Sequence, residues 1–362
     1  MLRLLYGWVL TLRSVWCVVR TALFLYCTSR YELDSLCAFM KLSRSLWHEV
    51  NGTVAPFQWG KTIYSDVWFD AVKKVVNTIA TMQLSSAEEA ALPGGAPYQF
   101  ARMTTAPTDT LMHSVGSPAA YTGMSRSSFR PSDDATTLPF LVPANAMAVV
   151  ELRAVAAMLR GLVKTSWGIT LASTRAVEVA ATAARAETLA SEIAAGIAAH
   201  GVRTHPSTQK QVYAYEADGF GNAQHMDDAN VPSLLSLPYL GFLDQNDPTY
   251  KATRQVVLSN STNPWFFQGK ACPMGGVGGA HVGLNSIWPM AIIMQAMTSD
   301  VDDEIATCLN QLVASTAGTG LMHESFDKDS VGTFTRPWFA WANSLFGTLV
   351  FKVVKERPHL LI

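Results

Sequence analysis

The chain has 362 residues, of which 49% are hydrophobic and 15% are charged, and its formal net charge is −1 at pH 7. This length allows one large domain or two, and the apolar content is ample for a large core. The near-zero charge, without dense clusters of Lys and Arg, argues against nucleic acid as a partner. The five cysteines and eight histidines follow no metal-ligand spacing, so we expect no disulfide framework, no metal and no other cofactor.

Residues 1–29 are strongly apolar, but Arg13 and Arg20 interrupt them. A membrane span needs about 20 apolar residues without a central charge, and no clear signal-peptide cleavage site follows. A signal-anchor, an amphipathic leading helix and a segment that is not native to the domain all fit, and we favour the last. Membrane contact is expected only through this segment, and residues 30–362 are expected to form a single domain.

Apolar residues recur at helical spacing through most of the remaining chain. The predicted helices cover residues 31–49, 65–84, 145–164, 173–200, 288–298, 299–317 and 335–355. Ser65 or Asp66 would cap the second, Ser299 would cap the sixth, and Pro337 would lie at the start of the last. Residues 85–128 are rich in Pro, Gly, Ser and Thr, which predicts a long irregular region. No strand pattern of convincing length appears, so we predict an all-α chain whose functional residues lie between helices.

Residues 213–240 form an acidic, aromatic stretch with four carboxylates: Glu216, Asp218, Asp227 and Asp228. Cores avoid unpaired carboxylates, and linkers avoid so many aromatics. Val231-Pro232 is typical of a first helical turn with Asn230 as its N-cap, which would place Asp227 and Asp228 at a helix N-terminus. Such a rigid loop suits polyol binding, because carboxylates accept hydrogen bonds from vicinal hydroxyls. In the alternative interpretation these acids only cap and form salt bridges.

Three further segments put a carboxylate or imidazole at a loop–helix junction: residues 130–134, 275–281 and 322–326. The glycine cluster at 275–279 lacks the ending of a phosphate loop, and we interpret it as backbone that passes close to a ligand and leaves His281 exposed. A helical barrel would bring Asp134 and Glu324 together at one end. Two facing carboxylates without a metal-ligand set suggest glycoside hydrolysis. Trp288 and other tryptophans would supply stacking walls, or alternatively would fill the core.

Long segments of the chain resemble glycoside hydrolase family 125. They are YEADGFGNAQHMDDANVPSLLSLPYLG, FRPSDDA, NPWFFQGKA, GGVGGAHVGLNSIWPMAIIMQA, AGTGLMHESF and FTRPWFAWANSLFG, together with RYELDSLCAF near the start. The resemblance covers about residues 30–350. It implies an (α/α)6 barrel and a metal-independent exo-α-mannosidase that acts on α-1,6-linked mannose and inverts the anomeric centre. The implied substrate is an α-mannoside oligosaccharide or a chain derived from an N-glycan, and no stable protein partner is implied.

Carried over to this sequence, the family's general base falls on Glu324. Its general acid falls in the RPSDD segment, where we prefer Asp134 to Asp133; Asp227 or Asp228 is the alternative. Arg336 or His323 would help to keep the base ionised. The remaining residues expected to hold the sugar are Arg130, Asp227, Asp228, Asn230 and His281.

The sequence departs from the family at its N-terminus, where a motif like TGDI–MWLRDS is absent and residues 1–29 stand in its place. We therefore expect a barrel that is incomplete there, with impaired activity. Two other functions stay open: a mannoside-binding protein without turnover, and an α/α-barrel hydrolase that acts on another glycan. Sequons at Asn51 and Asn260 permit glycosylation, and a secreted or secretory-pathway protein is slightly favoured over a cytoplasmic one.

Overall fold

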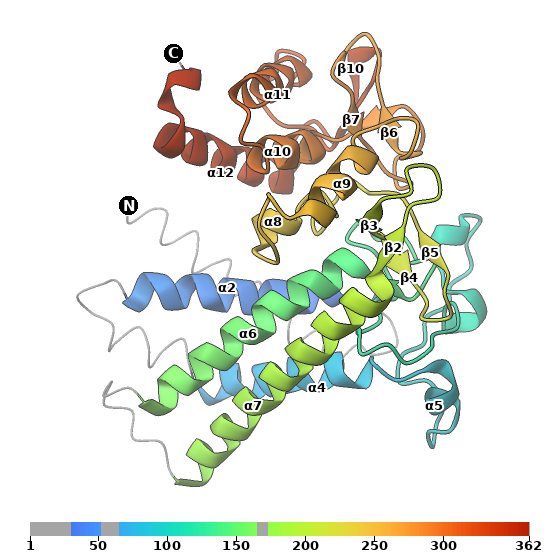
Figure 1. Cartoon of the computed structure of the whole chain (residues 1–362), viewed down its shortest axis with the longest axis vertical. Coiled ribbons are helices and arrows are strands. Elements are labelled where there is room, and N and C mark those ends of the chain that lie inside the picture. Colours follow the sequence, from blue (N-terminus) through green and yellow to red (C-terminus); the bar gives the residue numbers. More distant parts are fainter. Residues whose placement is uncertain (1–29, 52–64, 165–172, 362) are drawn as a thin grey trace. The chain divides into compact units, whose positions relative to one another are not determined.

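A computed structural model describes residues 30–51, 65–164 and 173–361 (Figure 1), so the predictions for residues 1–29 lie outside the described part. The chain divides into two compact units. Unit 1 contains the residues up to Arg130, 135–140 and 148–196. Unit 2 contains residues 131–134, 141–147 and those from Ile197 onward.

Unit 1 is built from long helices that are tied together by polar contacts. They are α2 (Leu33–Asn51), α4 (Asp66–Thr81), α6 (Val142–Lys164) and α7 (Ser173–Gly196), with a short α5 (Ser86–Ala90). The indole of Trp68 on α4 donates to Ser43 on α2 at 3.0 Å. Arg44 on α2 pairs with Glu151 on α6 at 2.7 Å. The first turn of α6 belongs to unit 2, so this helix runs from one unit into the other.

Unit 2 is organised around one buried helix. Its helices are α8 (Leu237–Leu240), α9 (Pro248–Val257), α10 (Pro289–Met297), α11 (Asp302–Ser315) and α12 (Ala340–Glu356). Eight of the nine residues of α10 are buried, as expected for a helix that is apolar on all sides. Both α11 and α12 pack against α10, so the core of this unit surrounds that helix (Figure 1).

Short strands lie in the loops between helices. β1 (Phe140–Leu141) precedes α6, and antiparallel pairs join β2 (Val202–Thr204) to β3 (Gln211–Tyr213), β4 (Glu216–Ala217) to β5 (Ala223–Gln224), and β6 (Phe266–Phe267) to β7 (Gly276–Val277). β8 (Ser286–Ile287), β9 (Ser325–Asp327) and β10 (Ser330–Thr335) form a three-stranded sheet. These pieces are too short to form a layer of their own, and they fix loop ends in place.

Most of the predicted helices are confirmed, within a few residues. Ser65 is the N-cap of α4, and its side chain accepts from the backbone N–H of Trp68. The helix predicted over 173–200 ends at Gly196 and continues as a π-helical turn, Ile197–Gly201. Residues 85–128 contain only α5 and two short 3₁₀ turns, Pro107–Asp109 and Met112–Ser114. None of the helices in the described ranges is both long and apolar enough to cross a bilayer.

Three predicted helix starts are wrong. No helix begins at Val231-Pro232, whose peptide bond is cis, and Asn230 instead donates its side-chain amide to Asp228. α11 begins at Asp302 with Val301 at the N-cap position, whereas Ser299 lies outside the helix, where its hydroxyl accepts from the Val301 N–H and donates to Glu304. α12 begins at Ala340, since residues 330–335 are taken up by strand β10.

Candidate active site

Asp134 and Glu324, the predicted acid and base, both belong to unit 2 and both lie in loops. Asp134 ends the short segment 131–134, in which the hydroxyl of Ser132 donates to Asp134 Oδ2 at 2.8 Å. Glu324 directly precedes β9, which pairs with β8 through Phe326 and Ile287. A strand therefore fixes the backbone at Glu324, and a local hydrogen bond orients the carboxylate of Asp134.

His281 lies close to these carboxylates and links them in one site. Its Nδ1 lies 3.5 Å from Asp134 Oδ2. The hydrogen bond to Asp134 raises the pKa of His281, burial opposes this shift, and the charges of Asp134, Glu324 and Asp133 raise the pKa further. The charges act on this imidazole only because all three carboxylates lie near it. The sequence elements expected to converge in a barrel thus meet around His281.

Asp133 and Asp134 differ in burial and in backbone conformation. Asp134 is 5% exposed, whereas Asp133 is exposed. Asp133 has a φ of 69°, in the left-handed region that few non-glycine residues adopt. Its conformation turns the chain so that the neighbouring Asp134 side chain is buried.

Glu324 is held by Arg336. The Nε of Arg336 lies 3.1 Å from Glu324 Oε1, and the guanidinium lies 5.6 Å from the centre of the Phe339 ring. The Glu324 side chain is 6% exposed, whereas that of Arg336 is 60% exposed. The ion pair therefore orients the Glu324 carboxylate at the site.

Trp288 forms an aromatic wall behind His281. The two rings make an edge contact with centres 6.4 Å apart, and Trp288 makes a second edge contact with Phe339 at 6.0 Å. Trp288 is 1% exposed, and its indole N–H has no hydrogen-bond partner among the described residues. Buried Trp N–H groups usually find a partner, so this donor is a distinctive feature of the site.

Asp227 forms hydrogen bonds within its own loop. Its two oxygens accept from the backbone N–H groups of Leu234 at 2.8 Å and Leu235 at 2.9 Å. Burial raises the pKa of Asp227 to about 7, although these hydrogen bonds act in the opposite direction. Both carboxylate oxygens thus contact the loop's own amides, and the sugar-binding role of Asp227 stays a prediction.

Asp228 joins the acidic loop to the glycine cluster. Its Oδ1 accepts from the backbone N–H of Asn230 at 3.0 Å and from the Asn230 side chain at 2.9 Å. A Cβ at Gly279 would lie 2.8 Å from Asp228 Oδ2, so only glycine permits this approach. The glycine cluster was predicted to pass close to a ligand, and at Gly279 the close neighbour is a side chain of the protein.

His323 is also structural. Its Nδ1 lies 2.8 Å from the carbonyl oxygen of Pro337 and its Nε2 lies 3.1 Å from that of Thr316, while its ring stacks on Phe334 at 3.8 Å. Both ring nitrogens therefore face backbone carbonyl oxygens, and the role of His323 at the sugar or beside the base stays a prediction. Arg130 belongs to unit 1, where it donates to Thr137 Oγ1 at 3.4 Å, and its role at the sugar stays a prediction.

Two residues of the site had no predicted role, namely Ser132 and Phe339. Ser132 could have been predicted from its position two residues before Asp134. Phe339 could not, because nothing in the sequence distinguishes it from an aromatic residue of the core. In the ranges that the structure describes, no three His, Cys, Asp or Glu side chains lie close enough together to hold a metal ion.

Helices joined by long loops, with an acid, a base and an imidazole meeting at the loop ends, fit the class of glycoside hydrolases. The chain belongs to the metal-independent alpha-mannosidase (GH125) family, whose model matches residues 21–351.

Two relatives show how far the likeness extends. The meiotically up-regulated gene 157 protein of Schizosaccharomyces pombe is 45% identical over 335 residues, which are 92% of this chain and 61% of that protein. A solved Streptococcus pneumoniae structure, described as a metal-independent alpha mannosidase in a non-productive complex with α-1,6-mannobiose, is 37% identical. It matches with a TM-score of 0.77 over 91% of this chain and 70% of its own. This agreement confirms the α/α-barrel class expected from the sequence.

Proposed function

We propose that this protein is an exo-acting α-1,6-mannosidase that inverts the anomeric centre. The observation that carries the proposal is the gathering of Asp134, Glu324 and Asp133 within electrostatic reach of His281. Family membership and the α-1,6-mannobiose in the Streptococcus pneumoniae structure support a mannoside as substrate. An oligosaccharide derived from an N-glycan fits the same chemistry.

In this mechanism Asp134 protonates the glycosidic oxygen while Glu324 removes a proton from a water molecule on the opposite face of the sugar. The water then attacks the anomeric carbon, and its configuration inverts. Inversion requires the two carboxyl groups to stand roughly 6.5–9.5 Å apart, which leaves room for that water. Arg336 orients Glu324 through the ion pair at 3.1 Å.

Burial favours Asp134 over Asp133 as the acid, because a buried carboxyl holds its proton more readily than an exposed one. His281 Nδ1 lies 3.5 Å from Asp134 Oδ2 and helps to orient this carboxyl group.

The test follows the anomeric form of the first mannose released from α-1,6-mannobiose, measured by proton NMR. We expect β-mannose first, and slower release from α-1,2- and α-1,3-mannobiose. Glu324→Gln and Asp134→Asn should each lower kcat by about 10²–10⁴-fold, whereas Asp133→Asn should lower it much less. Initial release of α-mannose would contradict inversion, and a larger loss in Asp133→Asn would exchange the roles of the two aspartates.

A mannoside-binding protein without turnover is the second candidate. The Ser132 hydroxyl and the His281 imidazole both contact Asp134 Oδ2. Both contacts favour the ionised carboxylate, which cannot act as an acid. Saturable binding of α-1,6-mannobiose by calorimetry, with no mannose released over days, would identify this function.

A further inference from the structure

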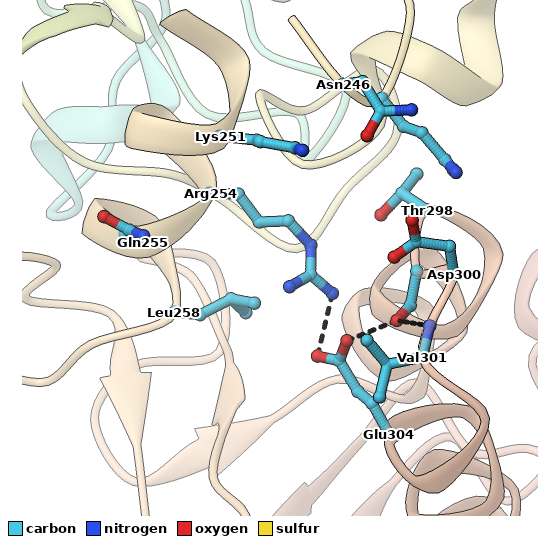
Figure 2. Close-up of a pocket in the computed structure, with 11 residues that line it drawn as sticks. Asn246, Lys251, Arg254, Gln255, Leu258, Thr298, Asp300, Val301 and Glu304 are labelled. Atoms are coloured by element: carbon cyan, nitrogen blue, oxygen red, sulfur yellow. Dashed lines mark hydrogen bonds and ion pairs between the residues drawn. The ribbon is translucent and has the colours of Figure 1, made fainter. Parts of the chain in front are cut away.

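A second polar pocket lies in unit 2 between α9 and the start of α11, with a volume of about 450 Å³ (Figure 2). Pockets of a few hundred Å³ are the usual size of small-ligand sites. None of the residues that line it belongs to the candidate active site.

One wall of this pocket is a single face of α9. Lys251, Arg254, Gln255 and Leu258 follow one another at spacings of three, one and three residues, which places them on the same side of the helix. The opposite face carries the buried residues Thr253 and Val256. The sequence therefore keeps a polar, charged stripe on the face of α9 that meets the pocket.

The other wall is the segment 298–301 and the first turn of α11. Burial opposes ionisation of Glu304. Hydrogen bonds from Ser299, Gln295 and Arg254 outweigh it and hold the pKa of this carboxyl below its usual range. The Arg254 Nη2 lies 2.8 Å from Glu304 Oε1, so the pocket has a fixed ion pair on its floor (Figure 2).

One hydrogen-bond donor on the α9 wall, the ammonium group of Lys251, is available to a ligand. Lys251 forms no ion pair with any described residue, and its side chain extends toward the pocket in Figure 2. Leu258 and Val301 add apolar surface between the charges.

We propose that this pocket is a second carbohydrate-binding site, separate from the candidate active site, which takes a neutral polyhydroxylated ligand such as a mannoside. Lys251 and Arg254 would repel a cation, while Glu304 and Asp300 would repel an anion. A sugar suits both signs, because each hydroxyl donates to a carboxylate and accepts from an ammonium or guanidinium. Its C–H face would pack on Leu258 and Val301.

The choice of a mannoside rests on the proposed function. The experiment uses the full chain carrying Glu324→Gln, with ¹³C-labelled Leu and Val methyl groups, titrated with α-1,6-mannobiose and followed by NMR. We expect saturable shifts of the Leu258 and Val301 methyls. Lys251→Ala should weaken this binding by about tenfold, because it removes a charged hydrogen-bond donor; tenfold corresponds to about 1.4 kcal/mol. Lys355→Ala, at an exposed position on α12, is the matched control and should leave the binding unchanged.

The absence of these methyl shifts, or equal binding in Lys251→Ala and Lys355→Ala, would overturn the proposal. Shifts produced by inorganic phosphate at lower concentration than by mannobiose would overturn it too, in favour of an anion site. The two proposals fail separately. If the unsubstituted protein releases mannose but the Leu258 and Val301 methyls do not shift, only the second site is contradicted. If the methyls shift but the unsubstituted protein releases no mannose, only the proposed hydrolysis is contradicted.

Discussion

At the scale of single residues, Arg336 combines a positive φ angle with an ion pair to Glu324. Its φ of 42° is unfavourable for a long side chain, and the surroundings must hold it there. Its Nε lies 3.1 Å from Glu324, and the Glu324 N–H donates to the carbonyl of the preceding Thr335 at 3.2 Å. The strained turn thus places a guanidinium against the proposed base.

Replacing Arg336 by Gln removes the ion pair that orients Glu324. We expect kcat to fall by less than about tenfold, because the arginine is largely exposed to water and such ion pairs are weak. The measurement is the rate of hydrolysis of α-1,6-mannobiose at one fixed pH. Arg102→Gln removes an ion pair with Asp109 in unit 1 and should leave kcat unchanged. An unchanged kcat in Arg336→Gln would show that Arg336 does not position the base.

His281 should make stability depend on pH. Because its hydrogen bond to Asp134 raises the folded-state pKa, the stabilisation is complete below the unfolded value of about 6.5 and is lost as pH rises through the raised folded value. The melting temperature of the wild type should therefore fall over this window by more than that of His281→Gln. His200→Gln is the control and should keep the wild-type slope. Parallel curves for the wild type and His281→Gln would rule out the coupling.

At the scale of elements, the close approach of the glycine cluster to the acidic loop can be tested by adding one methyl group. In Gly279→Ala the new Cβ would lie 2.8 Å from Asp228 Oδ2 and 3.0 Å from its Cγ, so the Asp228 side chain or one of the two loops must shift. We expect a loss of about 1–3 kcal/mol in the free energy of unfolding, together with weaker mannoside binding. Chemical denaturation and calorimetry measure the two effects.

The matched control for Gly279→Ala is Gly347→Ala. Gly347 lies inside α12, and a Cβ there would meet nothing within 4 Å. Alanine should stabilise that helix by about 0.5–1 kcal/mol. Equal effects at the two positions would show that the approach of Gly279 to Asp228 is not a constraint.

The sequence was a better guide to elements than to their ends. Helical periodicity predicted the long helices, and the cap at Ser65 was correct because that serine has no competing partner. Ser299 looked equally good as a cap, but its hydroxyl serves Glu304. Asn230 likewise serves Asp228. A capping residue with a nearby tertiary partner cannot be recognised from local sequence, since that partner is fixed only by the fold.

The same reason limited the prediction of the site. The resemblance placed the acid and the base in the segments that meet around His281. It could not show which carboxylates also hold a loop, as Asp227 does through the backbone N–H groups of Leu234 and Leu235. Nor could it foresee that His323 points both nitrogens at carbonyl oxygens, because backbone partners leave no mark in the sequence.

At the scale of the whole molecule, the chain passes repeatedly between its two compact units, and α6 is continuous across one of these passages. A helix gains its stability cooperatively, so the part of α6 in one unit cannot melt without weakening the part in the other. The two units are therefore expected to unfold in one transition, although each has a core of its own.

Leu159→Ala tests this coupling. Leu159 is fully buried on the part of α6 that belongs to unit 1, and its truncation should cost about 2–5 kcal/mol. If the units unfold together, hydrogen exchange should speed up by a similar factor in α4 of unit 1 and in α10 of unit 2, where no atom has changed. Val163→Ala is the control on the same helix, because Val163 is 44% exposed and its truncation removes little packing. Faster exchange in α4 with unchanged protection in α10 would mean that α6 frays between the units and that each unit unfolds by itself.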